Sequence, residues 1–150
     1  MSVRARGTTG LQVEISAGRH RLVADEPAGV GDDAGPDPYD LLLGALGACT
    51  VMTLQLYARR KGWPLEGVDV ALRHQNIHAR DCSDCEGDPN ARIAVIELEL
   101  ALRGALDPDQ ADRLRRIAER CPVHRTLVGE IKIRTSLAGG EAQKTGSSGG

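Results

Sequence analysis

The alternation of apolar and polar residues divides this chain into short segments grouped around one long apolar run. Residues 41–57 are apolar at nearly every position, so a helix built from them should be buried all round. Asp37 is a suitable N-cap, Pro38 suits the first helical position, and Gly62 suits the left-handed residue that often ends a helix. The pattern therefore predicts a central helix over residues 37–62.

Shorter segments with other periods lie on both sides of this run. Alternation with a period of two predicts strands at residues 3–6, 11–15, 20–24, 68–78, 92–103 and 131–137. The first three are short and closely connected, which favours an antiparallel meander. A capping box at Asp107 and Gln110 predicts a second helix over 107–120, and residues 123–127 suit one further helical turn. This order indicates an α+β fold with antiparallel sheets.

The length of 150 residues is enough for one domain with a substantial core. We expect residues 1–137 to form that domain and residues 138–150, rich in Gly and Ser, to be a flexible C-terminal tail. The net charge of −2 gives no electrostatic attraction to nucleic acid or to an anionic membrane. The aromatic content of 2% leaves few rings on which single-stranded bases could stack, so no nucleic-acid partner is expected.

The apolar run is nearly long enough to cross a membrane, but Thr50, Thr53 and Gln55 interrupt it. A helix of a soluble domain, with no membrane partner, is the better interpretation.

The first residues lack the apolar core of a signal peptide, so we expect a cytoplasmic protein. In a reducing compartment, the four cysteines are more often catalytic or metal-bound than structural.

Two of the cysteines stand in different local settings. Cys49 lies in the predicted central helix, where a small core side chain is the simplest interpretation. Cys121 precedes Pro122 at the expected N-cap of the next helical turn, where backbone N–H groups favour a thiolate. His124 and Arg125 follow within one turn and could add positive charge. An inert thiol at the end of a helix is the alternative for Cys121.

Taken together, the two cysteine segments resemble a known family. GPDPYDLLLGALGACT around Cys49 and CPVHRTL from Cys121 are similar to the two cysteine motifs of the OsmC/Ohr family, named for osmotically inducible protein C and organic hydroperoxide resistance. The resemblance extends over residues 18–137 and includes HRLVADEP before the central helix. The HARDCSDCE segment resembles one OsmC-like branch, which also occurs fused to α/β-hydrolase domains.

The resemblance implies a thiol peroxidase that reduces organic hydroperoxides and needs no cofactor. Cys49 would be the peroxidatic thiol, oxidised to a sulfenic acid, and Cys121 would resolve it as a Cys49–Cys121 disulfide. An external dithiol would then reduce that disulfide. The resemblance also implies an OsmC-like fold with a long buried central helix, assembled as an intertwined homodimer with its sites at the subunit interface.

The chain departs from the better-known members around the peroxidatic thiol. Those members support the reactive Cys with an Arg from the N-terminal strands and a Glu ten residues before the Cys. The position ten before Cys49 holds Tyr39, which we treat as a candidate substrate-binding residue, and Asp40 is better placed to cap the helix. Arg19 and Arg21 are the candidate supporting cations, although both suit exposed sheet positions equally well.

The other two cysteines form a separate candidate site. His78, Cys82 and Cys85 form the pattern H-x3-C-x2-C, in which Cys-x2-Cys is a spacing of metal ligands. A zinc site would need a fourth ligand, which Asp81, Asp84 or Glu86 could supply. A redox-active pair and an inert loop are the alternatives, and the acidic neighbours oppose the redox interpretation. His20 and His74 are expected to be ordinary strand residues.

Two functions follow from these observations. The first is the peroxidase. The second is a non-catalytic OsmC-like module that has lost the Arg and Glu support and binds a ligand or metal, either in its pocket or at the Cys82–Cys85 loop. Tyr39 in place of Glu favours the binding module, whereas the presence of both Cys49 and Cys121 favours the enzyme.

Overall fold

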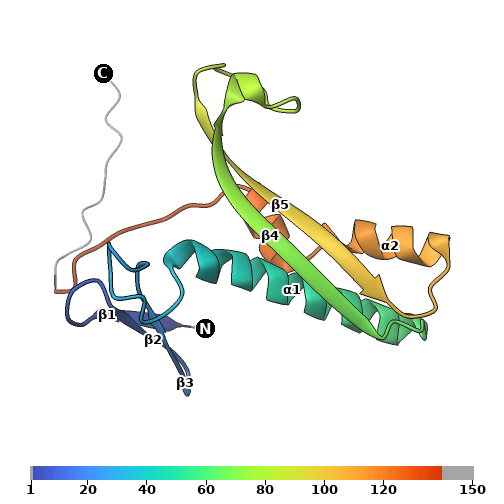
Figure 1. The fold of residues 1–150 in the computed structure, drawn as a ribbon, viewed down its shortest axis with the longest axis horizontal. Helices are drawn as coiled ribbons and strands as arrows, with labels where there is room; N and C mark the ends of the chain where they lie inside the picture. Colours follow the sequence, from blue (N-terminus) through green and yellow to red (C-terminus); the bar gives the residue numbers. More distant parts are fainter. Residues whose placement is uncertain (1, 140–150) are drawn as a thin grey trace.

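The computed structural model describes residues 2–139 and has an α+β fold with two antiparallel sheets (Figure 1). The elements follow in the order β1 (Val3–Gly7), β2 (Val13–Ala17), β3 (His20–Ala24), α1 (Pro38–Lys61), β4 (Gly67–His78), a short 3-10 turn η1 (Ala79–Asp81), β5 (Arg92–Arg103), α2 (Pro108–Ala118) and α3 (Pro122–Val128). The predicted fold class is confirmed. The predicted tail at 138–150 lies almost entirely outside the described residues.

The two ends of α1 form where the sequence predicts them. Asp37 accepts a hydrogen bond from the Asp40 backbone N–H, and the Asp40 carboxylate accepts one from the Asp37 N–H, which completes a capping box. At the other end Gly62 has φ 66°, a left-handed conformation in which a side chain would be strained. These local signals fix a helix of 24 residues.

The core forms where the β4–β5 hairpin and α2 pack on α1 (Figure 1). Leu54 of α1 and Leu114 of α2 are fully buried. The remaining members of this core are apolar residues on the inward faces of the same elements: Ala58, Val68, Ile117 and Ala118, with Val70, Leu100 and Leu102 packed against them. The hairpin register pairs Val70 with Leu100, so the alternation in the sequence places one apolar face of the hairpin on the helices.

The expectation that α1 is buried all round is wrong for the single chain. A stripe of side chains along one side of the helix is exposed, and Met52 and Leu56 are its largest apolar members, 61% and 52% exposed. The hairpin, α2 and α3 cover only the other side of α1. By length and composition alone α1 is also apolar enough to cross a membrane, a property that it shares with core helices of soluble proteins.

The three N-terminal strands form a separate sheet beside the N-terminal end of α1 (Figure 1). The order is β1–β2–β3, as predicted for a meander, although β2 begins two residues later than expected. The loop after β3 is closed by Asp25, a buried carboxylate that accepts backbone hydrogen bonds from Glu26, Asp32 and Ala34. This loop joins the sheet to α1.

The predicted strand at residues 131–137 is not formed. After α3 the chain runs without regular structure towards the side of the molecule that carries the N-terminal sheet (Figure 1). Ile131, Ile133 and Leu137 are exposed. Alternation indicates that a segment can be a strand, but a strand also needs a partner for its backbone hydrogen bonds, and the described part of this chain supplies none.

Candidate functional site

Cys49 and Cys121 lie side by side, close enough for a hydrogen bond between their side chains. Cys49 lies in the middle of α1, and Cys121 is the N-cap residue of α3. Neither cysteine is in a disulfide. Cys121 is fully buried whereas Cys49 is partly exposed, so Cys49 is the sulfur that a small molecule can reach.

The surroundings of Cys121 favour its thiolate. Burial by itself raises the pKa of Cys121, but the hydrogen bond from the Cys49 thiol, the backbone N–H groups of His124 and Val123, and the Thr50 hydroxyl together lower it below its ordinary value. The N–H groups lie near the sulfur without forming a full capping hydrogen bond. The position at the start of α3 therefore acts in the direction that the Cys-Pro sequence predicts.

The surroundings of Cys49 act in the opposite direction. Burial raises the pKa of the Cys49 thiol, and the neighbouring Cys121 raises it further, while the Val123 N–H and the Thr53 hydroxyl lower it by less. None of these groups carries a positive charge. In the single chain these surroundings therefore favour a thiolate at Cys121 over a thiolate at Cys49.

Two threonines of this site were missed by the sequence analysis. Thr50 is fully buried, and its hydroxyl donates to the Leu46 carbonyl at 2.9 Å or, alternatively, to the Cys121 sulfur, because one O–H proton serves one acceptor at a time. Thr53 lies one helical turn after Cys49 and contacts its sulfur. The signal was their spacing from Cys49, but we had interpreted both only as interruptions of an apolar run.

An apolar cavity of about 220 Å³ lies one helical turn from both cysteines. Leu46 precedes Cys49 by three residues, and His124 follows Cys121 by three, so both share a helix face with their cysteine. The rest of the lining comes from β5 and α3: Ala94, Ile96, Leu98, Leu127 and Val128. The cavity can hold a small apolar group next to the thiol pair.

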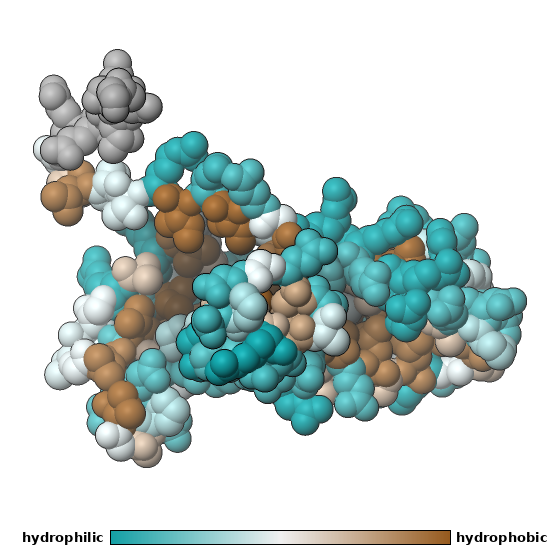
Figure 2. Space-filling model, turned by 90° about the horizontal axis from the view of Figure 1, so that it is seen from above, coloured by the Kyte–Doolittle hydropathy of each residue, from teal (hydrophilic) through white to brown (hydrophobic). Residues whose placement is uncertain are grey.

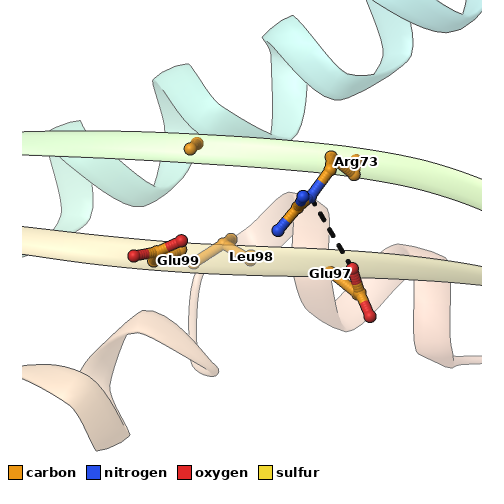
Figure 3. Close-up of a pocket in the computed structure, with 5 residues that line it drawn as sticks. Arg73, Glu97, Leu98 and Glu99 are labelled. Atoms are coloured by element: carbon orange, nitrogen blue, oxygen red, sulfur yellow. Dashed lines mark ion pairs between the residues drawn. The ribbon is translucent and has the colours of Figure 1, made fainter.

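A larger, open recess of about 380 Å³ crosses the β4–β5 hairpin (Figure 3). Arg73 and Glu97 face each other across it at 3.7 Å, and Glu99 points away from them. Both members of this ion pair are mostly exposed, so it contributes little to stability. The recess is lined by these charged residues with Ala71 and Leu98, and none of them is a nucleophile.

The predicted supporting residues lie elsewhere in the single chain. Arg19 in the β2–β3 turn and Arg21 in β3 are both exposed, and the Arg21 guanidinium donates to the backbone carbonyls of Gly18 and His20. Tyr39 stacks on His74 with ring centroids 4.3 Å apart. Because Tyr39 is ten residues before Cys49, it is about 15 Å away along the helix axis. Within residues 2–139 of one chain, neither an arginine nor Tyr39 reaches Cys49.

The predicted metal ligands are only partly gathered. Cys82 and Cys85 form a disulfide in the loop at the end of the hairpin, and Asp84 lies beside them. His78 precedes this loop at the end of β4 and lies outside the close group of three. Its Nδ1 atom is buried without a hydrogen-bond partner among the described residues.

Comparison with known sequences identifies one family and no curated relative. The family model described as OsmC-like protein matches residues 31–136, which include both segments of the thiol pair. No curated protein matches the chain.

Solved structures with the same fold come from several bacteria. An OsmC-like protein from Mycoplasma pneumoniae is 18% identical with a TM-score of 0.63, over 85% of this chain and 86% of that one. An organic hydroperoxide resistance protein OsmC from Legionella pneumophila is 20% identical with a TM-score of 0.61, over 85% and 88%. The organic hydroperoxide resistance protein OhrB of Bacillus subtilis is 22% identical with a TM-score of 0.53, over 85% and 90%. At these identities the likeness establishes the fold.

Proposed function

This chain belongs to the OsmC-like protein family, and on that premise we propose that it is a cysteine-based peroxidase that reduces organic hydroperoxides in defence against peroxide stress. The observation that carries the proposal is the contact between a reachable thiol, Cys49, and a buried thiol, Cys121. Two neighbouring cysteines can take two electrons from a peroxide and store the oxidation as a disulfide. The names of the solved hydroperoxide resistance proteins support the same substrate class.

The first step uses the single negative charge of the pair. Transfer of the shared proton from Cys49 to Cys121 makes Cys49 the thiolate, which attacks the distal oxygen of the hydroperoxide. The O–O bond breaks as the S–O bond forms, and the Cys121 thiol returns the proton to the departing alkoxide. The products are an alcohol, a Cys49 sulfenic acid and a Cys121 thiolate.

The second step closes the disulfide. The Cys121 thiolate attacks the Cys49 sulfur, hydroxide leaves and takes a proton from solvent to become water. The environment that lowers the pKa of Cys121 suits this step, since the resolving sulfur must be a thiolate when the sulfenic acid appears. An external dithiol then reduces the disulfide by exchange, which returns both thiols and leaves the reductant oxidised.

The first step needs a positive charge at Cys49, and the described residues of one chain bring none to it. We propose that it comes from Arg19 or Arg21 of a second copy of the chain in a homodimer. A guanidinium beside Cys49 would favour its thiolate and would hold the peroxide oxygens through its planar fork. The site would then be complete only in the dimer.

Exposed apolar surface supports the homodimer independently. The α1 stripe with Met52 and Leu56 is uncovered, as are Ile131 and Ile133 after α3. Figure 2 shows apolar side chains gathered around a recess between the part of the molecule that holds the N-terminal sheet and the rest. Large apolar side chains that are exposed together are typical of an association surface. A second copy offers the same stripe and the same unpaired segment, as a two-fold interface requires.

The alternative is a non-catalytic binding module. Tyr39 favours it, because a phenol stacked on His74 cannot replace a carboxylate that would anchor an arginine. In that case the 220 Å³ cavity would hold a ligand while the thiols stay reduced.

A single-turnover oxidation separates the two functions. Fully reduced protein is mixed with one equivalent of an aryl-alkyl hydroperoxide, and the cysteine peptides are identified by mass spectrometry. The peroxidase predicts a Cys49–Cys121 disulfide in wild type and a trapped Cys49 sulfenic acid in Cys121→Ser. Oxidation confined to Cys82 and Cys85, or none at all, would favour the binding module.

A further inference from the structure

The loop that closes the β4–β5 hairpin has a chemistry that the peroxidase mechanism does not use. It lies at the end of the hairpin away from α2 (Figure 1). Cys82 and Cys85 are half-buried there, with their Cα atoms 5.4 Å apart and a disulfide between them. Two thiols three residues apart, projecting from a loop, can switch between a disulfide and a pair of metal ligands.

The ligand atoms are already close to the geometry of a small metal site. The sulfurs of Cys82 and Cys85 and a carboxylate oxygen of Asp84 all lie within 4.8 Å of one another. In a tetrahedral zinc site with sulfur bonds of about 2.3 Å, neighbouring sulfurs are about 3.8 Å apart. Cys82 Sγ is 3.2 Å from Asp84 Oδ1. In the dithiol form a thiol proton could lie between these two atoms, and a bound cation could take the place of that proton. Opening the disulfide requires only a small movement to reach this geometry.

The charge of the loop favours a cation over a free thiolate. Residues 79–91 contain four carboxylates and only one basic side chain, Arg80. Negative neighbours oppose the formation of a thiolate, and Cys82 is the C-cap residue of η1, so it does not lie at the N-terminus of that turn. A redox-active pair that must form a reactive thiolate would be poorly placed here. A divalent cation would instead be attracted by the carboxylates and would stabilise both thiolates.

His78 gives a second and independent indication of a ligand. Its Nδ1 atom is buried and has no hydrogen-bond partner among the described residues, which is unfavourable for a buried polar atom. It lies four residues before Cys82, at the end of β4 where the loop with the two cysteines begins. Coordination through this nitrogen would give it a partner.

We propose that the reduced loop binds one Zn²⁺ through Cys82, Cys85 and Asp84, with His78 as the fourth ligand, and that the disulfide is its oxidised, metal-free form. An external dithiol supplies two electrons and two protons to open the disulfide and is itself oxidised to a disulfide. Zn²⁺ then replaces the two thiol protons. Exchange with an oxidised dithiol reverses the sequence: its disulfide accepts two electrons from the thiolates and two protons from solvent, the Cys82–Cys85 S–S bond forms, and Zn²⁺ is released.

Zinc titration of the full chain tests this site. The protein is reduced with a phosphine, which does not compete strongly for zinc, and is titrated with Zn²⁺ against a chromophoric chelator. We expect one zinc per chain, an affinity at least about 100-fold weaker in Cys82→Ser and Cys85→Ser, and at least about tenfold weaker in His78→Gln and Asp84→Asn. Asp88→Asn, in the same loop, and Cys121→Ser, at the thiol pair, are matched controls that should bind as wild type does.

Cobalt identifies the ligands directly. Co²⁺ bound by thiolates gives a sulfur-to-metal charge-transfer absorption, which we expect in reduced wild type, in Cys121→Ser and in Asp88→Asn, but not in Cys82→Ser with Cys85→Ser. Far-UV circular dichroism shows whether each variant is folded. The proposal is overturned if reduced wild type binds no stoichiometric zinc, or if the double variant keeps the affinity and the cobalt absorption of wild type. Unchanged affinity in His78→Gln overturns the assignment of the fourth ligand.

Discussion

The side chains of Cys49 and Cys121 lie close enough to interact, although Cys49 lies within α1 and Cys121 is the N-cap residue of α3. This contact raises the pKa of the sulfur that a peroxide can reach and lowers the pKa of the one that it cannot. In the single chain, the more exposed residue of the pair, Cys49, is therefore the one whose thiolate is disfavoured. A peroxidase built on this pair needs a further group that moves the charge to Cys49.

Replacing Cys121 should make Cys49 more acidic. Burial, the first cause of its raised pKa, remains in Cys121→Ser, but the hydrogen bond to a thiolate and its repulsion are lost. The pKa of Cys49 should fall, so its alkylation by a small reagent should be faster than in wild type at pH values below that pKa. Rates are measured as a function of pH in chains that also carry Cys82→Ser and Cys85→Ser. A pKa that stays the same or rises would contradict the coupling.

Only one of the two N-terminal arginines should matter for turnover. Arg→Lys keeps the positive charge but loses the planar fork, so hydroperoxide turnover should fall at least about tenfold, or about 1.4 kcal/mol in the barrier, for the arginine that reaches Cys49. The other variant is the matched control. The test measures steady-state rates of hydroperoxide consumption by Arg19→Lys and Arg21→Lys. Unchanged circular dichroism shows that each variant is folded. Wild-type rates in both variants would exclude these arginines from the site.

The exposed stripe of α1 should hold two copies of the chain together. Met52→Asp places a charge in the proposed apolar interface and should convert a dimer into a monomer, as measured by sedimentation velocity at low micromolar concentration. Ala71→Asp, on the exposed face of β4, is the control and should remain dimeric. A wild-type monomer, or a Met52→Asp dimer as stable as wild type, would contradict the assembly.

The sequence predicts those features that local chemistry determines. Asp37, Asp40 and Gly62 determine the ends of α1 through hydrogen bonds within a few residues, and the alternation in β4 and β5 determines which face packs on the helices. The sequence could not show which side of α1 stays uncovered. An apolar position in the pattern does not say whether an element of the same chain or of a second chain packs on it. The missing strand at 131–137 has the same explanation, since a partner strand is not encoded in the segment itself.

The candidate site was only partly predictable. The N-cap position of Cys121 follows from the Cys-Pro sequence, but its pairing with Cys49 was expected only from the family resemblance, because nothing in the spacing of the two residues brings them together. Thr50 and Thr53 were missed, since a threonine that serves a thiol has the same sequence pattern as one that interrupts an apolar run. The distances of Arg19 and Arg21 from Cys49 depend on the tertiary fold, whereas the separation of Tyr39 from Cys49 follows from the rise of α1.

The loop before α1 should be sensitive to acid. The Ala34 N–H, with those of Glu26 and Asp32, lowers the pKa of Asp25 below its ordinary value of 3.8, although burial acts against it. A carboxylate with a lowered folded-state pKa stabilises the protein above pH 3.8, and this contribution is lost as the pH falls through the folded-state pKa. Asp25→Asn should therefore have a lower Tm than wild type at pH 7, and the difference should shrink towards pH 3. A difference that is constant or grows in acid would contradict this role.

The most direct test of the account is the rate at which purified protein consumes an organic hydroperoxide in the presence of an excess of a small dithiol. We predict that wild type and the Cys82→Ser, Cys85→Ser double variant turn over repeatedly at similar rates, that Cys121→Ser is slower by at least about tenfold, and that Cys49→Ser shows no turnover above the uncatalysed rate. Absence of turnover in the wild type, or wild-type turnover in Cys49→Ser, would contradict the claim that Cys49 is the peroxidatic thiol.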